Sequence, residues 1–419
     1  MFSIVSNLLG LALFGGIFRA GLSSKCIPPS FVCERGHFRP NSSCTVSNVM
    51  LNPSLGEWST TSRTKDNFND DVFRVSKCNY SFEKHEVCLR HHADCNLYVS
   101  QEAVLFSVYY HYEHGNFYHF FYDTVMPLFS ALSTYYTKQQ SDGLMLLPFV
   151  EHGSLPGFAK GVDWKTRAFH TKSMVNGEVV VTTTVWTNIL NVLFGKGNSL
   201  VPLDSTFSDK LNLRGNVCFG NVRFGLPKYN HTDTTFLNGF RHFVFLRLKL
   251  PPPLPVQDIV RQTGHHALFV KRINRRRILN QEELIANIAD ILPTTIISFE
   301  GMPFREQVRL STKCTVFIGM QGAGIMNAMY LPSGSAIVVL FQYMAASDSF
   351  SSMFAGRARP YLRWVNKDKN NSFVKNESMD PYHDNADTIV DLQAFRGVIE
   401  DALAKLKKMA SLTENVDDL

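Results

Sequence analysis

Apolar and polar positions alternate regularly over the second half of the chain. Short apolar runs, typical of buried strands, occupy residues 266–271, 294–299, 314–320 and 336–341. Apolar residues at helical spacing lie between these runs. They predict one helix that begins at Asn280, with Glu283 as its capping-box partner, and another that begins at Pro303. Because strands and helices alternate, we predict an α/β fold with a parallel sheet and helices on both of its faces.

The first half of the chain is less regular. Residues 104–110 and the β-branched run 179–186 predict strands, and residues 118–136 predict a helix with a kink at Pro127. Four prolines within residues 251–255 exclude a helix or a central strand there and indicate a linker. A last amphipathic helix is predicted near the C-terminus, at residues 392–409.

These features divide the chain into segments. They are an apolar leader (1–23), a cysteine-rich region (24–95), a first α/β domain (96–250), a proline-rich linker (251–258), a second α/β domain (259–385), a C-terminal helix (386–410) and an acidic tail (411–419). The length of 419 residues suits two domains better than one core.

The leader is an apolar run without a preceding Lys or Arg. We interpret it as a signal peptide with a cleavage site around Ser23; an uncleaved type II membrane anchor and a buried core helix are the alternatives. Only this stretch could touch a bilayer, which excludes a polytopic membrane protein. Five Asn-x-Ser/Thr sequons agree with secretory entry, and they lie at Asn41, Asn79, Asn230, Asn370 and Asn376.

Six of the eight cysteines lie within the first hundred residues, at positions 26, 33, 44, 78, 88 and 95. Clustered cysteines behind an apolar leader indicate a disulfide-stapled region in an oxidising lumen. Zinc is the weaker alternative because no Cys-x-x-Cys pair occurs. The terminal Val-Asp-Asp-Leu resembles an endoplasmic-reticulum retention signal. We therefore expect a soluble luminal or type II membrane protein of the endoplasmic reticulum or Golgi.

Composition narrows the classes of function. Hydrophobic residues make up 45% of the chain and charged residues 19%, which is typical of a globular protein. The net charge of +6, from 42 Lys and Arg against 36 Asp and Glu, is too small and too spread out to indicate a nucleic-acid binder. It fits a globular protein with a local anion site.

Two segments at predicted strand ends could form that site. Gln321, Gly322, Ala323 and Gly324 join a strand to a helix, and a phosphate fits such a turn because the helix N-terminus offers free N–H groups. Glycine turns also form without a ligand, so this signal alone is weak. The basic run 271–277 follows another strand, and its Arg272 and Arg276 could clamp a diphosphate; a solvated basic turn is the alternative.

Polar side chains elsewhere are further candidates. His119 and Asp123 lie four apart on a predicted helix, close to Asn116, and could act as a general base or merely satisfy each other in a core. Glu300 follows the second strand and could accept a hydrogen bond from a sugar hydroxyl or cap the next helix. No histidine spacing matches a common metal site and no Asp-x-Asp triplet occurs, so we expect no metal.

Taken together, these segments resemble glycosyltransferase family 61. The resemblance rests on residues 116–123, 272–280, Glu300 and 317–341, and it covers roughly residues 95–410. It implies the GT-B architecture, in which two Rossmann-like domains face a cleft, the first on the acceptor side and the second holding the nucleotide sugar. It also implies inverting, metal-independent transfer of N-acetylglucosamine from UDP to a Ser/Thr hydroxyl, or to an O-linked glycan, on an extracellular-type domain.

The resemblance assigns roles to the candidate residues. Arg272, Arg276 and the turn at 321–324 would hold the donor diphosphate, and from its position after the second strand we place Glu300 on the donor side as well. Asn116, His119 and Asp123 would line the cleft from the other domain, with Asp123 or His119 as the base. The implied partners are a nucleotide sugar and a glycoprotein acceptor, without a further cofactor and without nucleic acid; a membrane is involved only if the leader is an uncleaved anchor.

Two residues depart from the family pattern. The family usually has His where this chain has Gln321, and Glu where it has Val339. Gln321 can still donate a hydrogen bond, but it carries no charge. At position 339, if the family's Glu holds the ribose, its absence removes a hydrogen bond to a charged group, which costs about 1.5–3 kcal/mol, or tenfold or more in donor affinity. Two alternatives therefore stay open: a different donor such as UDP-xylose, and a catalytically inactive relative that binds glycoproteins.

Overall fold

The computed structural model describes three N-terminal strands and most of the chain after residue 95. The described residues are 31–33, 44–52, 57–60, 96–108, 117–136, 143–150, 170–175, 178–183, 185–201, 215–224, 226, 229–345, 348–354, 359–375, 380, 383 and 385–417. The leader, Asn116 and most of the cysteine-rich region lie outside them, so the predictions made there stay predictions. Within the described residues, no helix is both long and apolar enough to cross a bilayer.

The second half folds around a parallel sheet of five strands. The strands are β11 (Ala267–Val270), β12 (Thr294–Ile297), β13 (Val316–Met320), β14 (Ala336–Phe341) and β15 (Tyr361–Val365). They lie in the order β12-β11-β13-β14-β15, and each neighbouring pair is parallel. Every residue of β11, β13 and β14 is buried, which explains why these strands read as continuous apolar runs.

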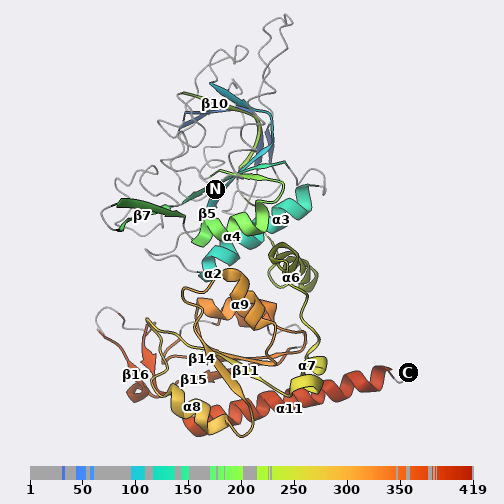
Figure 1. The fold of residues 1–419 in the computed structure, drawn as a ribbon, viewed down its shortest axis with the longest axis vertical. Helices are drawn as coiled ribbons and strands as arrows, with labels where there is room; N and C mark the ends of the chain where they lie inside the picture. Colours follow the sequence, from blue (N-terminus) through green and yellow to red (C-terminus); the bar gives the residue numbers. More distant parts are fainter. Residues whose placement is uncertain are drawn as a thin grey trace, which may run out of the picture.

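Helices cover both faces of this sheet, as predicted (Figure 1). They include α8 (Gln281–Ile288), α9 (Phe304–Ser311), the 3-10 helix η4 (Ala323–Tyr330) and α11 (Leu392–Asp417). Side chains of α8 and α11 pack with Phe269 and Ile318 on one face. Side chains of α9 and η4 pack with Leu268 and Phe317 on the other, because successive strand residues point to opposite faces.

The strand order changes direction between β11 and β13. From β11 the chain passes to β12 on one side, and then to β13, β14 and β15 on the other. In open parallel sheets, ligands bind outside the carboxyl ends of the strands at such a switch point. The segments that follow β11 and β13 are the basic run and the glycine turn, so the topology brings these two motifs together.

In the first half, eight of the described strands form a mixed sheet. They are β1 (Phe31–Cys33), β2 (Cys44–Asn52), β3 (Glu57–Thr60), β4 (Leu97–Val99), β5 (Ala103–Val108), β6 (Met145–Val150), β9 (Ser199–Leu200) and β10 (Val217–Phe224). Strands β10, β5, β6 and β9 are parallel neighbours, whereas β2 pairs antiparallel with β10. The described strands β7 (His170–Val175) and β8 (Glu178–Thr183) form a separate hairpin. This mixed α/β arrangement is compatible with a Rossmann-like transferase, and the finer GT-B assignment stays a prediction.

Helices of the first half contact the second half (Figure 1). They are α2 (Phe117–His119), the π-helix η2 (Phe120–Val125) and α6 (Thr234–Leu248), whereas α3 (Met126–Tyr135) and α4 (Val185–Phe194) contact α6 within the first half. The ring centroid of Phe121 lies 5.2 Å from that of Phe304 on α9. Arg305 donates its Nε–H to the carbonyl oxygen of Leu248 at 3.0 Å. The two halves therefore share one continuous apolar core.

Some predicted element boundaries were wrong. Val185 and Trp186 begin α4 instead of ending a strand, because Ile189, Leu190, Leu193 and Phe194 are buried at helical spacing and burial outweighs β-propensity. Helix α7 (Val256–Thr263) begins inside the predicted linker, directly after Pro255, since proline is tolerated at a helix start. Helix α11 continues to Asp417, through most of the predicted acidic tail.

The predicted capping role of Asn280 was also wrong. Helix α8 does begin after Asn280, but this side chain makes no capping hydrogen bond. Its Nδ2 donates to the carbonyl oxygen of Val390 at 2.7 Å, and the Val390 N–H donates to its Oδ1 at 3.0 Å. The amide therefore joins the start of α8 to the segment before α11.

The cysteines that the structure describes differ in state. Cys218 on β10 takes part in a disulfide, whereas Cys314 is a buried free thiol. Burial raises the pKa of Cys314 to about 12, so this thiol stays protonated at neutral pH. Strand pairing places the backbones of Cys33 and Cys44 opposite each other. The predicted disulfide staple depends on side chains outside the described residues and stays a prediction.

Candidate functional site

The glycine turn lies at the end of β13, where the sheet has its switch point. Gln321 follows the strand and donates its N–H to the carbonyl oxygen of Leu340 at 2.7 Å. Gly322 has φ +154°, and η4 begins with Ala323. The predicted helix thus exists as a 3-10 helix. Its first N–H groups have no partner within the helix, so they can bind an anion.

Two arginines from the loop after β11 reach this turn. Arg272 and Arg276 each donate an Nη1–H to the same carbonyl oxygen, that of Gln321, at 3.2 and 3.1 Å. The contact depends on a residue without a side chain at position 322, because a Cβ on Gly322 would overlap Nη1 of Arg272. The sequence therefore combines a long cationic side chain on one strand end with a glycine on the next.

The charge of Arg272 is poorly compensated in the free protein. The pKa of Arg272 is lowered to about 10, mainly by burial and then by the charges of Arg276 and Arg275. Glu300 raises this pKa by a smaller amount. A buried cation beside like charges favours binding of an anion, because the anion supplies the neighbouring negative charge that the cation lacks. A diphosphate fits two guanidinium groups that converge beside a helix N-terminus.

These groups open into a cavity between the two halves. Its volume is about 1320 Å³, and it is lined by Phe117 and by residues of α4 and α6 from the first half, together with Arg272, Arg276 and Gly322 from the second. A smaller cavity of about 200 Å³ shares Phe117 and Arg272 and extends to Gly324. An interdomain crevice therefore lies over the turn.

Glu300 lines both cavities and fixes the basic loop. Its Oε1 accepts from the N–H of Ile273 at 3.3 Å, and its Oε2 accepts from Nδ2 of Asn274 at 2.7 Å. It does not cap α9, whose N-cap residue is Pro303. The carboxylate keeps free lone pairs toward the cavities, where it can accept hydrogen bonds from hydroxyl groups.

Sequence reasoning missed a buried amide pair beside the turn. Nδ2 of Asn327 donates to Oε1 of Gln307 at 3.1 Å, and Gln307 in turn donates to the carbonyl oxygen of Met302 at 2.8 Å. Asn327 and Gln307 both line the smaller cavity. Oδ1 of Asn327 is buried without a partner among the described residues. In the sequence, the one hint that Asn327 lies beside the turn is its position three residues after Gly324, which is one turn of a 3-10 helix.

His119 and Asp123 form a pair, as predicted from their spacing. Nδ1 of His119 lies 2.7 Å from Oδ2 of Asp123, and the two side chains are 28% and 33% exposed. They lie where α2 passes into the π-helix, whose wider turn is marked by the bond from the Met126 N–H to the Phe121 carbonyl. Neither residue lines the two cavities, although Phe117 on the same helical segment lines both.

A short segment of the second half, residues 348–354, supports this helical segment; it consists of a loop that leads into the helix α10 (Ser351–Phe354). Phe350 packs edge-on against Tyr118 with ring centroids 5.1 Å apart, and Ser349 forms a hydrogen bond with the Tyr118 side chain. Burial raises the pKa of Tyr118 to about 12, so it stays a neutral phenol. His231 bridges the same two elements, with Nδ1 3.0 Å from the Tyr122 hydroxyl and Nε2 3.5 Å from Oγ of Ser352.

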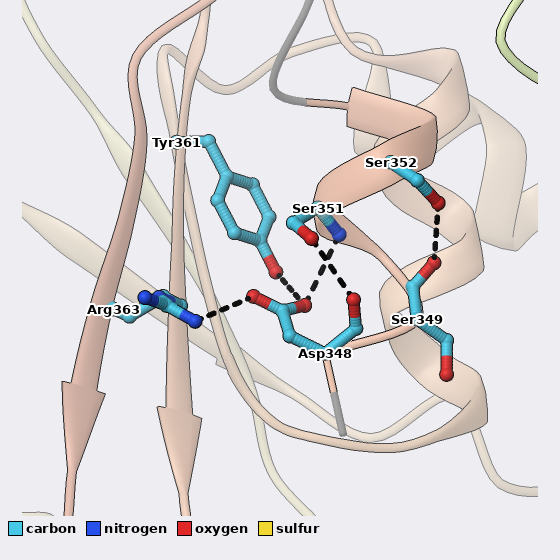
Figure 2. A network of polar contacts seen from close by, with 6 residues as sticks. All are labelled: Asp348, Ser349, Ser351, Ser352, Tyr361 and Arg363. Carbon is cyan, nitrogen blue, oxygen red and sulfur yellow. Dashed lines mark hydrogen bonds and ion pairs between the residues drawn. The ribbon is translucent and has the colours of Figure 1, made fainter.

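The carboxylate of Asp348 holds this loop in place (Figure 2). Its Oδ1 accepts from the Tyr361 hydroxyl at 2.7 Å and from the N–H of Ser351 at 3.1 Å, and its Oδ2 accepts from Nη1 of Arg363 at 3.4 Å. Tyr361 and Arg363 belong to β15, so the sheet anchors a loop that ends against the helix of His119. The structure thus couples the sheet of the second half to the segment that carries His119 and Asp123.

The site defines a class of protein: an α/β protein with a cationic cavity at the switch point of a parallel sheet. No group of three or more His, Cys, Asp or Glu side chains that could hold a metal ion occurs within the described ranges. The chain belongs to the family Glycosyltransferase 61, which matches residues 117–338. This range includes His119, Asp123, both arginines and the glycine turn. The resemblance drawn from the motifs is confirmed.

Relatives with known names support this assignment. The chain is 26% identical over 167 residues to the EGF domain-specific O-linked N-acetylglucosamine transferase of Drosophila melanogaster, covering 36% of this chain and 31% of the relative. It is 31% identical over 108 residues to protein O-linked-mannose beta-1,4-N-acetylglucosaminyltransferase 2 of Bos taurus, covering 24% and 19%. The mouse protein of that name is 29% identical over 119 residues, covering 27% and 20%. Each match spans less than a third of the relative's length.

Proposed function

We propose that this protein is an inverting glycosyltransferase that moves N-acetylglucosamine from UDP to a Ser/Thr hydroxyl, or to an O-linked glycan, on an extracellular-type domain. The observation that carries the proposal is the convergence of Arg272 and Arg276 on the carbonyl oxygen before Gly322, at the edge of the interdomain cavity. The names of the relatives support the choice of donor sugar and of acceptor class.

In this proposal, UDP is the leaving group. The acceptor oxygen attacks the anomeric carbon, the bond from that carbon to the phosphate oxygen breaks, and negative charge grows on the diphosphate. Arg272 and Arg276 stabilise this charge as fixed cations. Because they supply the positive charge that a metal ion could supply, we propose transfer without a metal.

The pair of His119 and Asp123 is the proposed proton acceptor. Both side chains are about one-third exposed, so the acceptor hydroxyl can approach them. A base must come within about 2.6–3.2 Å of the hydroxyl that it deprotonates. Since neither residue lines the cavities, the proposal requires the acceptor to reach from the cavity to the exposed side of α2 and η2.

The test combines UDP binding and sugar transfer. We expect calorimetry to show that UDP binds the wild type, and that Arg276→Ala weakens this binding about 100-fold because a buried charged contact costs about 3 kcal/mol. Asp123→Asn is expected to lower kcat while UDP binding stays. Arg277→Ala, in the same loop but lining neither cavity, is the matched control. The proposal fails if UDP does not bind or if Arg276→Ala keeps full turnover.

The two alternatives rest on Gln321 and Val339. Gln321 has no charge to offer, and the side chain of Val339 is fully buried in β14, so position 339 presents nothing to a ligand. A screen of several UDP-sugars separates the cases. Turnover with UDP-xylose alone would select a different donor, and UDP binding without any turnover would select an inactive glycoprotein-binding relative.

We further propose that the protein works in the endoplasmic reticulum lumen or the Golgi, as a soluble luminal or type II membrane protein. Exposed sequon residues at Asn230 and Asn370 support this placement. Expression in a secretory cell line, with and without a glycosidase that removes N-linked glycans, tests it through the mass of the secreted or luminal product.

A further inference from the structure

The larger cavity is also lined by cations from elements other than the glycine turn and the basic run. Arg247 and Lys249 at the end of α6 and Arg305 at the start of α9 line it. The bond from Nε of Arg305 to the Leu248 carbonyl brings the two elements together. We call Arg247, Lys249 and Arg305 the outer cations. They are distinct from Arg272 and Arg276, which hold the carbonyl of Gln321.

The outer cations have no carboxylate partner within the described part of the chain. Arg247 lies over the ring of Phe243, with 5.3 Å from its Cζ to the ring centroid, and Arg305 bonds only to a carbonyl. The nearest acid in sequence, Glu306, forms its ion pair with Arg309 and has only a weaker electrostatic attraction to Arg305. Glu300 is the one carboxylate among the described residues that line this cavity, against six Lys and Arg side chains. The cavity therefore has a large excess of positive charge.

The size and lining of the cavity indicate a second ligand beside the nucleotide. About 1320 Å³ exceeds the roughly 300–1,000 Å³ of a pocket for one small molecule. Apolar side chains alternate with the outer cations, including Ile189 and Val192 of α4 and Met302. Val192 is 45% exposed, although it is apolar. A mixed apolar and cationic surface complements a polypeptide with apolar and acidic side chains better than it complements a glycan.

We propose that this outer part of the cavity binds the acceptor polypeptide and selects acceptors with Asp or Glu close to the modified hydroxyl. The inference rests on the proposed function and adds the charge of the acceptor to it. Opposite charges at the cavity mouth attract acidic acceptors and repel basic ones, and the effect weakens as salt shortens the screening length.

The test uses the full chain, UDP-N-acetylglucosamine and three threonine peptides of equal length, with acidic, neutral or basic flanks. We expect kcat/KM for the acidic peptide to exceed that for the neutral one about tenfold near 0.15 M salt, since several exposed charge pairs act together. The difference should lie mainly in KM and shrink at high salt. Peptide binding measured by fluorescence anisotropy in the presence of UDP gives a readout that does not depend on turnover.

Charge reversal provides the decisive variant. Arg247→Glu with Lys249→Glu should reverse the preference toward the basic peptide, while UDP binding and thermal unfolding stay as in the wild type. Lys249→Gln alone should reduce the preference, which covers the case in which the double variant does not fold. Lys408→Glu, at an exposed position on α11 away from the cavity, is the matched control and should change nothing.

The outcomes separate the two proposals. If UDP does not bind the wild type, the proposed function itself is wrong. If UDP binds but the three peptides bind and react equally, or if the reversal variant keeps the preference for the acidic peptide, the inference is overturned and the donor proposal stands. A stronger preference for an acidic glycan than for every peptide would also overturn the choice of a polypeptide.

Discussion

Replacing Arg272 by methionine should make the protein more stable and less able to bind its ligand. Arg272 is largely buried beside two other arginines, and burial, followed by the charges of Arg276 and Arg275, lowers its pKa to about 10 from 12.5. The folded state therefore disfavours the charged side chain. Because the folded pKa lies below the unfolded one, this penalty is present in full at every pH below about 10, including neutral pH.

The size of the effect follows from the structure. A lowering of the pKa from 12.5 to about 10 corresponds to a penalty of about 3 kcal/mol on the charged form. The hydrogen bond to the Gln321 carbonyl, which methionine cannot make, offsets about 1 kcal/mol of it. Methionine keeps most of the apolar stem. We expect Arg272→Met to raise the free energy of unfolding by about 1–2 kcal/mol, or about 3–6 °C in Tm.

Thermal unfolding and calorimetry with UDP measure both halves of this prediction. UDP should raise the Tm of the wild type but not of Arg272→Met, whose affinity should fall about 100-fold. Lys408→Met is the control, since Lys408 is exposed and lines neither cavity, and it should change stability by less than about 0.5 kcal/mol. An Arg272→Met protein that is less stable than the wild type, or that binds UDP normally, would refute the reasoning.

Substitutions at Gly322 and at Asp348, each with a control variant, test the contacts around the site. Gly322→Ala should displace the Arg272 guanidinium, which a new Cβ would overlap, and weaken UDP binding about tenfold in calorimetry. Gly397→Ala on α11 meets nothing within 4 Å and should instead stabilise the protein by about 0.5–1 kcal/mol with binding unchanged. Asp348→Ala should lower the free energy of unfolding by about 1–3 kcal/mol in urea titration, because three donors lose their acceptor. It should also reduce kcat through the loop against Tyr118, and Asp348→Asn, which keeps one acceptor oxygen, should lose less; equal losses in both variants would contradict this.

The second sheet was predictable because its central strands are buried on both faces. Such strands read as continuous apolar runs, and their carboxyl ends meet at one edge. For that reason Arg272 and Gly322, which are 50 positions apart in sequence, could be expected at one site. The strand order was not predictable, since apolar runs say nothing about which strand lies beside which. The switch point between β11 and β13 is therefore a finding of the structure.

The first half was predicted less well because its contacts are nonlocal. Strand β10 pairs with β2 through Val217 and Leu51, which lie far apart in the chain, and no local pattern encodes that pairing. The wall of the cavity was missed for a different reason. The β-branched residues before α4 favoured a strand prediction that extended to Trp186, so the helix that carries Ile189 and Val192 was not anticipated.

The cavity still has an acceptor for hydroxyl groups, although position 339 is Val where the family usually has Glu. The side chain at this position is enclosed in the core of the sheet, so a ligand would gain nothing from it. The exposed Glu300 carboxylate nevertheless lines the smaller cavity and offers oxygen acceptors there. A ribose or a sugar ring presents hydroxyl donors to such oxygens. The proposal of an active transferase therefore depends on whether the Glu300 carboxylate replaces the missing one, and not on the presence of Val339 itself.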